Sequence, residues 1–373
     1  MCPITRGTAP LVASLSSTRL QFETAHQDTV NTPVALYGGT HLNLMKIGIV
    51  TPAPPKSRYG NRVTALRWAR ILRVLGHRVN IIREYQSQSF DLLIALHARR
   101  SHQSIERFHR EHPNRPIIAA LTGTDLYRDL QKSKHAQQSL QLAARIIVLQ
   151  PKAREELDEQ LRRKVRLIYQ SVQIRSRRKP EESSSSPGSF DVCVIGHLRE
   201  VKDPFRAAMS ARLLPSWSRI RIIQVGEAMT NQMMGRARKE VKANARYHWL
   251  GELPQWRVRQ VLSRCRACVV SSKMEGGANV LSEAIVAGVP VVASRIPGNV
   301  GILGDDYPAY FKSGDTSDLA QLLLRTETDA RFLKSLRQYC AKLAPLFKPS
   351  RETAAWEALL RELSQCGKQR ESR

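Results

Sequence analysis

Residues 267–294 read ACVVSSKMEGGANVLSEAIVAGVPVVAS, and this stretch decides the fold. Its two ends, 267–271 and 290–293, are short apolar runs of the kind that form strands buried on both faces. Between them, a loop with two glycines opens a helix expected over 280–287. A strand, a helix and a second strand in this order predict a parallel βαβ unit.

The same alternation extends over most of the chain in two series. Further strands are expected at 46–51, 78–83, 91–97, 117–122, 145–150 and 165–170, and then at 190–195, 220–225 and 247–250. Helices are expected near 62–75, 204–214, 255–265, 316–325 and 351–363. The pattern predicts an α/β protein with two Rossmann-like, doubly wound parallel sheets that face a central cleft, where such folds bind ligands.

The length of 373 residues suits two domains of about 150 residues each. Residues 1–44 are rich in Ser and Thr and lack periodicity, so we expect a disordered leader, or a true start at Met45. The expected N-terminal domain is 45–173, and the expected C-terminal domain is 190–345. Residues 174–189, IRSRRKPEESSSSPGS, read as a linker. Residues 346–373 are expected to form a helix that packs back on the N-terminal domain.

The chain is strongly basic, with 59 Lys and Arg against 32 Asp and Glu and a net charge of +27. Such a balance favours anionic partners: nucleic acid, an anionic membrane face or phosphate-bearing small molecules. A general arginine bias explains it equally well, because the basic residues are scattered. No apolar run reaches the ~20 residues of a membrane helix, so we expect a soluble, cytoplasmic protein.

Six cysteines are spread thinly, and Cys265 and Cys268 form a C-x-x-C late in an expected helix, without a second pair. Buried thiols in a reducing cytosol explain this spacing more readily than a zinc or redox site.

The loop before the helix at 280–287 carries the strongest candidate site. Gly276 and Gly277 let the backbone approach a ligand closely, and N–H groups at a helix start form a cradle for a diphosphate. Two carboxylates flank this cradle, one before the helix and one a turn into it. The expected contacts are Glu275, Gly276, Gly277, Ala278, Asn279, Val280 and Glu283.

A second candidate follows the strand at 190–195, where the chain reads GHLREVKDP from Gly196. A cation at the carboxyl end of a strand can neutralise a diphosphate and stabilise a leaving group. We favour Lys202 for this role over Arg199, and Arg199 over His197, and we expect Gly226 to lie at the same site. No Asp-x-Asp is present to hold a metal, and no G-x-G-x-x-G follows the first strand, so neither a metal nor a nicotinamide cofactor is expected.

Three loops after strands of the N-terminal domain are rich in cations and suit a small anionic acceptor better than a neutral one. They are 52–61, 97–101 and 122–128. The candidate acceptor-binding residues are Arg58, Gly60, Asn61, Arg62, Arg99, Arg100, Thr122, Gly123, Thr124, Asp125 and Arg128, with His97 as a catalytic candidate. Ordinary solvated arginines are the alternative for any single member of this set.

The segment EGGANVLSEAIVAGVPVVAS from Glu275 resembles the Glu-x7-Glu signature of the retaining family-four glycosyltransferases, which have the GT-B fold. The resemblance implies metal-independent transfer of a sugar from a nucleotide diphosphate. It places Glu275 beside the donor sugar and Glu283 on the ribose hydroxyls. Lys202 falls on the lysine of the family. His197 stands where the family usually has arginine, and Arg199 could substitute for it.

Motifs in both domains more closely resemble the selenosugar synthases of selenoneine biosynthesis, over about residues 46–333. They are GNRVTALRWARIL, ALHARRS, LTGTDLYRD, VLQP, GHLREVKDPF, WLGELP, MEGGANVLSEA and GVPVVAS. The resemblance implies transfer of N-acetylglucosamine, or a related hexose, from its UDP derivative to selenophosphate. A carbon–selenium bond forms and phosphate is ultimately lost. His97 and Asp125 are candidates for orienting the acceptor or assisting phosphate release.

Three other functions stay open. The chain could be a UDP-sugar transferase with a sugar or lipid hydroxyl acceptor, or a nucleotide-sugar epimerase, which needs no acceptor. A nucleic-acid-binding protein is supported by charge alone, because aromatic residues make up only 6% of the chain and no aromatic–basic platform is visible. The oligomeric state is open.

Overall fold

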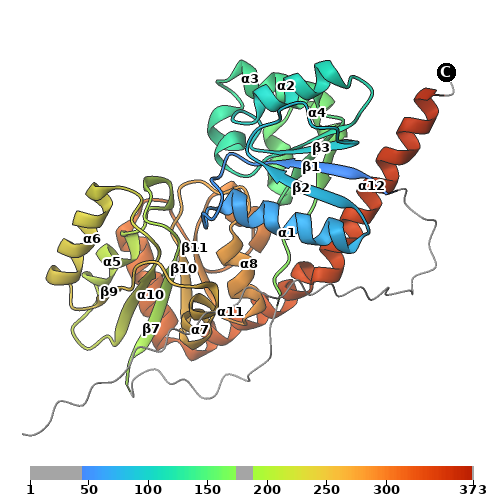
Figure 1. The fold of residues 1–373 in the computed structure, drawn as a ribbon. Helices are drawn as coiled ribbons and strands as arrows, with labels where there is room; N and C mark the ends of the chain where they lie inside the picture. The colour runs from blue at the N-terminus through green and yellow to red at the C-terminus, as the bar shows by residue number, and fades with distance from the viewer. Residues whose placement is uncertain (1–43, 174–187, 372–373) are drawn as a thin grey trace, which may run out of the picture. The chain divides into compact units, whose positions relative to one another are not determined.

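The strands form two parallel sheets of six strands each in the computed structural model, which describes residues 44–173 and 188–371 (Figure 1). Parallel pairing requires each connection to cross over the sheet, and helices make most of these connections. The α/β class with two doubly wound parallel sheets, predicted from the sequence, is confirmed. The expected leader and linker fall on residues 1–43 and 174–187, which lie outside the described residues.

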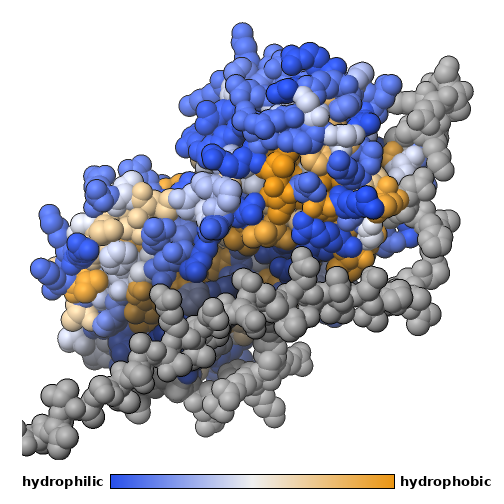
Figure 2. All heavy atoms as spheres, viewed as in Figure 1, coloured by the Kyte–Doolittle hydropathy of each residue, from blue (hydrophilic) through white to orange (hydrophobic). Residues whose placement is uncertain are grey.

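The first sheet, in the order β2-β1-β3-β4-β5-β6, is built from the N-terminal half of the chain. Its strands are β1 (Lys46–Val50), β2 (Arg78–Ile82), β3 (Leu92–Leu96), β4 (Ile117–Ala120), β5 (Arg145–Val148) and β6 (Val165–Leu167). Its helices are α1 (Gly60–Val74), α2 (His102–Glu111), α3 (Lys134–Leu142) and α4 (Glu159–Lys164), with a π-turn at Asp125–Asp129 and a 3-10 turn at Pro151–Glu156. Hydrophilic side chains cover the surface over α2 and α3 (Figure 2).

The second sheet, in the order β12-β11-β10-β7-β8-β9, is built from the C-terminal half. Its strands are β7 (Phe190–Ile195), β8 (Ile220–Val225), β9 (Tyr247–Trp249), β10 (Ala267–Val270), β11 (Val291–Ser294) and β12 (Tyr310–Phe311). Its helices are α5 (Arg206–Ala211), α6 (Asn231–Ala243), α7 (Gln255–Arg264), α8 (Asn279–Val286), α9 (Pro297–Leu303), α10 (Thr316–Thr328) and α11 (Ala330–Leu343), with 3-10 turns at Glu200–Lys202 and Ala344–Phe347. The strand order changes direction between β7 and β10, which leaves a crevice beyond their carboxyl ends.

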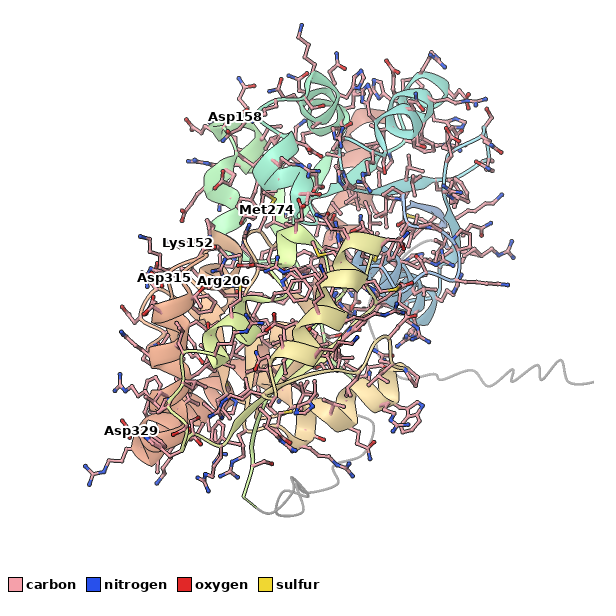
Figure 3. The ribbon with its side chains drawn as sticks, turned by 90° about the vertical axis from the view of Figure 1, so that its left-hand side faces the viewer. Lys152, Asp158, Arg206, Met274, Asp315 and Asp329 are labelled. Atoms are coloured by element: carbon pink, nitrogen blue, oxygen red, sulfur yellow. The ribbon has the colours of Figure 1, made fainter. Side chains whose placement is uncertain are left out.

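Acidic side chains define where several helices begin (Figure 3). Asp158, Asp315 and Asp329 each accept a hydrogen bond from a backbone N–H in the first turn of α4, α10 and α11. Carboxylates suit this position because the first N–H groups of a helix have no partner within it.

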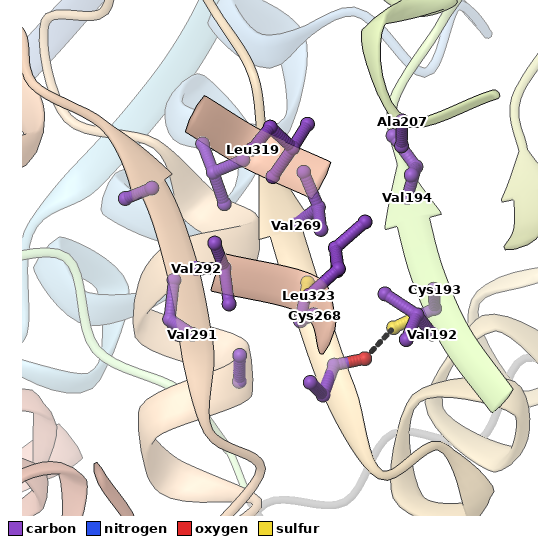
Figure 4. Packing of buried hydrophobic residues seen from close by; sticks show 14 of the residues in the cluster. Val192, Cys193, Val194, Ala207, Cys268, Val269, Val291, Val292, Leu319 and Leu323 are labelled. Atoms are coloured by element: carbon purple, nitrogen blue, oxygen red, sulfur yellow. Dashed lines mark hydrogen bonds between the residues drawn. The ribbon is translucent and has the colours of Figure 1, made fainter. Parts of the chain in front are cut away.

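The core of the C-terminal half lies between its sheet and the covering helices. Val269 and Val292, on the neighbouring strands β10 and β11, belong to the same buried cluster as Leu319 and Leu323 of α10 (Figure 4). These side chains are almost fully buried, as expected for strands covered on both faces.

The last helix, α12 (Pro349–Glu371), contributes to the core of the N-terminal half. Trp356 is fully buried and meets the ring of Trp68 on α1 edge-on, with ring centroids 5.0 Å apart. Leu359 and Leu360 join the same cluster. The hydrophobic core of the N-terminal half is therefore completed by side chains of α12.

The observed strands of the N-terminal sheet end earlier than the sequence predicted. The difference is largest at β6, where the expected strand continues to 170, followed by β4 and β5, which were expected to reach 122 and 150. Backbone pairing nevertheless goes on past the assigned ends, because the N–H groups of Leu121 and Ile168 donate to the carbonyls of Ile147 and Val148. The chain then turns away to form the loops that carry the candidate site.

Candidate functional site

A pocket lies at the switch point of the second sheet, beyond the ends of β7, β8 and β10. It is lined by Gly196, Lys202, Ser272, Glu275 and Val280 among others. Lys202 and Glu275, predicted from separate motifs, form an ion pair there. The structure therefore brings the two strongest sequence candidates together in one pocket.

A buried serine fixes the carboxylate of this pair. The hydroxyl of Ser272 donates to Glu275 Oε1 at 2.6 Å, and Glu275 is only 8% exposed. The same oxygen accepts a hydrogen bond from the ammonium group of Lys202. A carboxylate held by a cation and a hydroxyl has its orientation set before any ligand arrives.

The neighbouring serine fixes the lysine loop. The hydroxyl of Ser271 lies 3.1 Å from the carbonyl of Lys202 and 2.9 Å from that of Asp203, whose φ of +43° is left-handed. The N–H of Lys273 donates to the carbonyl of Val201 at 2.9 Å. Ser271 and Ser272 were missed in the sequence. A paired serine directly after the buried strand was the only available signal.

The two glycines at 276 and 277 allow contact with loops of the N-terminal half. A Cβ on Gly276 would lie 2.4 Å from the carbonyl carbon of Thr122, and one on Gly277 would lie 2.6 Å from the Cβ of Leu149. The backbone of Gly123 also approaches Gly276 closely. At these positions the absence of a side chain allows one loop to pack against another, and it also leaves room for a ligand to approach the backbone.

The first turn of α8 has no side-chain cap from Ala278, the residue that precedes it. Asn279 instead accepts a hydrogen bond of 3.0 Å from Arg67 of α1. One turn further on, Glu283 is half-buried, and burial raises the pKa of its carboxyl against the opposing effect of Arg67 and Arg259. Two cations therefore surround the carboxylate expected to bind ribose.

Gly226 and His197 lie beside Gly196, which lines the pocket, but they do not line it themselves. Gly226 has a φ of +147°, and a Cβ there would lie 2.0 Å from the carbonyl oxygen of Gly196. The ring of His197 accepts from the N–H of Glu227 at 3.3 Å and meets Tyr59 edge-on. Gly226 thus permits two strand-end loops to touch, and His197 is held at their junction.

Arg199 precedes the 3-10 turn of Lys202 and has an exposed side chain. The pocket is lined by Lys202 and not by Arg199.

In the N-terminal half, His97 is buried with a left-handed φ of +73° directly after β3. Its Nε2 lies 3.3 Å from the hydroxyl of Thr124 and 3.8 Å from Asp129. Burial lowers the pKa of its imidazole, and the charge of Asp125 opposes this shift while that of Arg100 reinforces it. Strained backbone at a buried histidine is a feature of functional sites.

Asp129 neutralises two of the expected acceptor-binding cations. Its carboxylate accepts from Arg99 at 2.8 Å and from Arg128 at 3.1 Å. Burial opposes ionisation of Asp129, but the two arginines outweigh it and its pKa is lowered. Arg100 is exposed beside them. The loops are thus less cationic than a count of their arginines suggested.

Asp125 is fully buried within the π-turn. Its carboxylate accepts hydrogen bonds from the backbone N–H groups of Ala98, Thr122 and Gly123 at 2.8–3.2 Å. Asp125 therefore joins two loops through these hydrogen bonds, whereas the sequence predicted that it would contact the acceptor.

Arg58 reaches the C-terminal half, where it donates to the carbonyl of Leu253 at 2.9 Å and pairs with Glu252. Gly60 and Asn61 begin α1, followed by Arg62, which is half-buried. Arg58 therefore connects the segment before α1 to the loop before α7.

The C-x-x-C is not within a helix, since Cys265 follows α7 and Cys268 lies on β10. Cys268 is opposite Cys193 of β7 in the sheet, and both thiols are buried. Among the described residues, no group of three His, Cys, Asp or Glu is arranged to hold a metal. In the same parts of the chain, no helix is long and apolar enough to cross a membrane.

Comparisons with known proteins agree with this geometry. Residues 176–344 match the family model described as glycosyl transferases group 1. The fold is similar to that of Anabaena Alr3699/HepE, crystallised in complex with UDP (TM-score 0.69, 14% identity, covering 85% of this chain and 99% of that chain). Sucrose-phosphate synthase from Thermosynechococcus elongatus is also similar (TM-score 0.67, 15% identity, 86% of this chain and 99% of that chain).

A third similar structure is the pneumococcal O-GlcNAc transferase GtfA, solved with UDP and GlcNAc. Its TM-score is 0.56 at 17% identity, over 73% of this chain and 56% of that chain. At such identities the likeness establishes the fold, which is the two-sheet GT-B arrangement.

Proposed function

We propose that this chain, whose residues 176–344 match the family model of glycosyl transferases group 1, transfers a hexosamine from a UDP-sugar to selenophosphate. The observation that carries the donor half is the Lys202–Glu275 pair, fixed by Ser272 at the switch point of the second sheet. Similar structures hold UDP or UDP-glucose, which supports UDP as the nucleotide.

The donor is expected to bind across α8. Its sugar would lie near Glu275, its diphosphate near Lys202 and the uncapped first turn of α8, and its ribose near Glu283. Lys202 then stabilises the negative charge that develops on UDP as the glycosidic bond breaks, a task that requires a fixed cation in a partly dry site. The resemblance of the sequence to selenosugar synthases supports N-acetylglucosamine as the sugar.

The acceptor is expected beside His97, Thr124 and the arginines of the N-terminal loops. Selenium of selenophosphate attacks the anomeric carbon, so that a C–Se bond forms while the bond from that carbon to the UDP oxygen breaks. The electron pair of the broken bond leaves with UDP. Hydrolysis of the Se–P bond by water then releases phosphate and the selenosugar.

A selenium nucleophile is already anionic near neutral pH, so the site needs no strong general base. This demand matches His97, because burial lowers the pKa of its imidazole and keeps it neutral at pH 7. A neutral imidazole near the Thr124 hydroxyl can orient the acceptor by hydrogen bonding. Exposed Arg100 adds a further cation beside them.

The test is to incubate the full chain with UDP-N-acetylglucosamine and selenophosphate, and to follow UDP release and a selenium-containing hexosamine by mass spectrometry. Release of UDP only with a sugar or lipid hydroxyl would overturn the selenium acceptor and leave a UDP-sugar transferase. Conversion of the sugar without any acceptor would indicate an epimerase. Binding of RNA with a steep salt dependence, without binding of UDP-sugar, would indicate a nucleic-acid-binding protein.

The acceptor site is tested separately with Arg99→Ala and Arg100→Ala. Both changes are expected to raise the KM for selenophosphate more than the KM for the UDP-sugar. Arg107→Ala is the control, because Arg107 pairs with Glu111 on α2. The reverse pattern of KM values would place the acceptor elsewhere.

A further inference from the structure

Arg67 of α1 is a half-buried cation that lies outside both candidate donor motifs. Its Nη2 donates to Oδ1 of Asn279 at 3.0 Å, although 212 positions separate the two residues. Asn279 is the first residue of α8, where the diphosphate cradle was expected. A side chain from the N-terminal half is therefore attached to the donor helix of the C-terminal half.

The same contact brings the guanidinium close to Glu283. Asn279 and Glu283 are four residues apart on α8, so their side chains lie on one face of the helix. Arg67 is the first of two arginines that act electrostatically on Glu283, the other being Arg259 of α7. Glu352 of α12 is a further carboxylate near Arg67, but it already accepts hydrogen bonds from Trp68 and Ser171.

Both arginines retain an unused donor. Nη1 of Arg67 and Nε of Arg259 are enclosed without a hydrogen-bond partner among the described residues. An enclosed N–H that lacks an acceptor costs about 1–3 kcal/mol, which a ligand oxygen would recover. These two N–H groups belong to the arginines that act on Glu283. Lys202, in contrast, lines the pocket with Glu275.

The chemistry of the pair identifies the ligand group. Ionised Glu283 only accepts hydrogen bonds, and Arg67 only donates them. A hydroxyl both donates and accepts, so each hydroxyl of a diol can be satisfied by such a pair. A nucleotide offers this group in its ribose 2′,3′-diol.

We propose that Arg67 is a donor-specificity residue, which places a fixed N–H and a positive charge beside Glu283 so that the two together select the ribose diol of the nucleotide. The proposal rests on the proposed binding of a UDP-sugar. It adds a contribution from the N-terminal half to a site whose other members lie in the C-terminal half.

The experiment is to measure the Kd of UDP and of 2′-deoxy-UDP by calorimetry for wild type, Arg67→Gln, Arg67→Lys and Arg70→Gln. Arg70 is the matched control, because it lies on the exposed face of the same helix. Wild type and Arg70→Gln are expected to prefer UDP by about 10-fold or more. Arg67→Gln is expected to lose most of this preference, and Arg67→Lys to lose part of it.

The pH dependence of UDP binding gives a second readout. In Arg67→Gln, Glu283 faces only Arg259, so its carboxyl should protonate at a higher pH. UDP binding should then weaken at a higher pH than in wild type as the pH is lowered from 8 to 5. The variant Glu283→Gln should remove the difference between the two backgrounds, and leave only the dependence that comes from the terminal phosphate of UDP.

Several outcomes separate the two proposals. If wild type binds UDP and Arg67→Gln keeps both the preference for UDP and the wild-type pH profile, the role of Arg67 is overturned while the proposed function stands. If wild type binds no uridine nucleotide, the proposed function fails and the role of Arg67 fails with it. Thermal unfolding identifies a variant that does not fold, in which case Arg67→Lys decides.

Discussion

Lys202 and Glu275, 73 residues apart in the chain, share one ion pair at the switch point of the C-terminal sheet. Each therefore holds the other in the pocket before a ligand enters. In the proposed binding of the donor, a diphosphate would draw Lys202 toward itself, and Glu275 would then become available to the hydroxyls of a sugar. The pair thus links the arrival of the phosphates to the readiness of the carboxylate.

Lys202→Ala is expected to lower kcat by about 100-fold or more, because it removes the cation that stabilises the leaving diphosphate. Steady-state kinetics with a UDP-sugar measure the effect. Lys202→Arg keeps the charge and should recover part of the activity. Wild-type kinetics in Lys202→Ala would remove the assignment of the leaving-group site.

Ser272→Ala should lower kcat by about 10-fold, because the hydrogen bond to a charged carboxylate contributes roughly 1.5–3 kcal/mol to its placement. Ser210→Ala is the matched control, since Ser210 is also buried but donates to carbonyls of Arg206 and Thr316, away from the pocket. Both variants should lose some thermal stability. Equal kcat values in the two variants would contradict a positioning role for Ser272.

Gly276→Ala should abolish most activity, because the new Cβ would overlap the backbone of Thr122 and push two loops apart. Gly235→Ala is the control. It lies within α6 with nothing near the added carbon, and alanine there should stabilise the protein by up to about 1 kcal/mol. Chemical denaturation and kinetics together distinguish loss of stability from loss of the site. Full activity in Gly276→Ala would show that the loops tolerate separation.

Glu362 of α12 accepts hydrogen bonds from Arg145 and Arg166, and the bond from Arg166 is the main reason why the pKa of its carboxyl is lowered. A lowered pKa means that the unfolded chain binds the proton more tightly. The ionised carboxylate of Glu362 therefore contributes to the stability of the folded state above the ordinary glutamate pKa. This contribution is lost as the pH falls through the lowered pKa of the folded state.

The expected result is that Glu362→Gln lowers the free energy of unfolding at pH 7 by roughly 1 kcal/mol or less. The difference from wild type should shrink below about pH 4, near the ordinary glutamate pKa. Urea unfolding between pH 3 and pH 7 measures it. A difference that does not change with pH would show that the pair contributes through packing alone.

The sequence predicted the parallel sheets well, because buried parallel strands are short, apolar and separated by helices. It also pointed to Lys202 and Glu275, because both lie in loops that follow such strands. Arg67 could not be found in this way. It lies in the middle of a helix, where a polar residue normally faces solvent, and its partner is on the other half of the chain.

The loops of the expected acceptor site were harder to predict from the sequence. The sequence indicated which loops would carry charge, but not which charges would be neutralised. Asp129 was not considered, although it accepts from both Arg99 and Arg128. Asp125 was counted as a contact, although its oxygens are occupied by backbone N–H groups. Such assignments depend on which loop oxygens meet which side chains after folding, and no local pattern encodes that.

Trp356 has a consequence for how the chain is made. The core around Trp68 needs the side chains of α12, which leaves the ribosome after all the strands of both sheets. During synthesis, the sheet that is translated first keeps an open apolar surface, while the sheet that is translated second has all of its own strands. The order in which the two halves reach their final form should therefore be the reverse of the order of translation, and a ribosome stalled before α12 should display the first half as a site for chaperones.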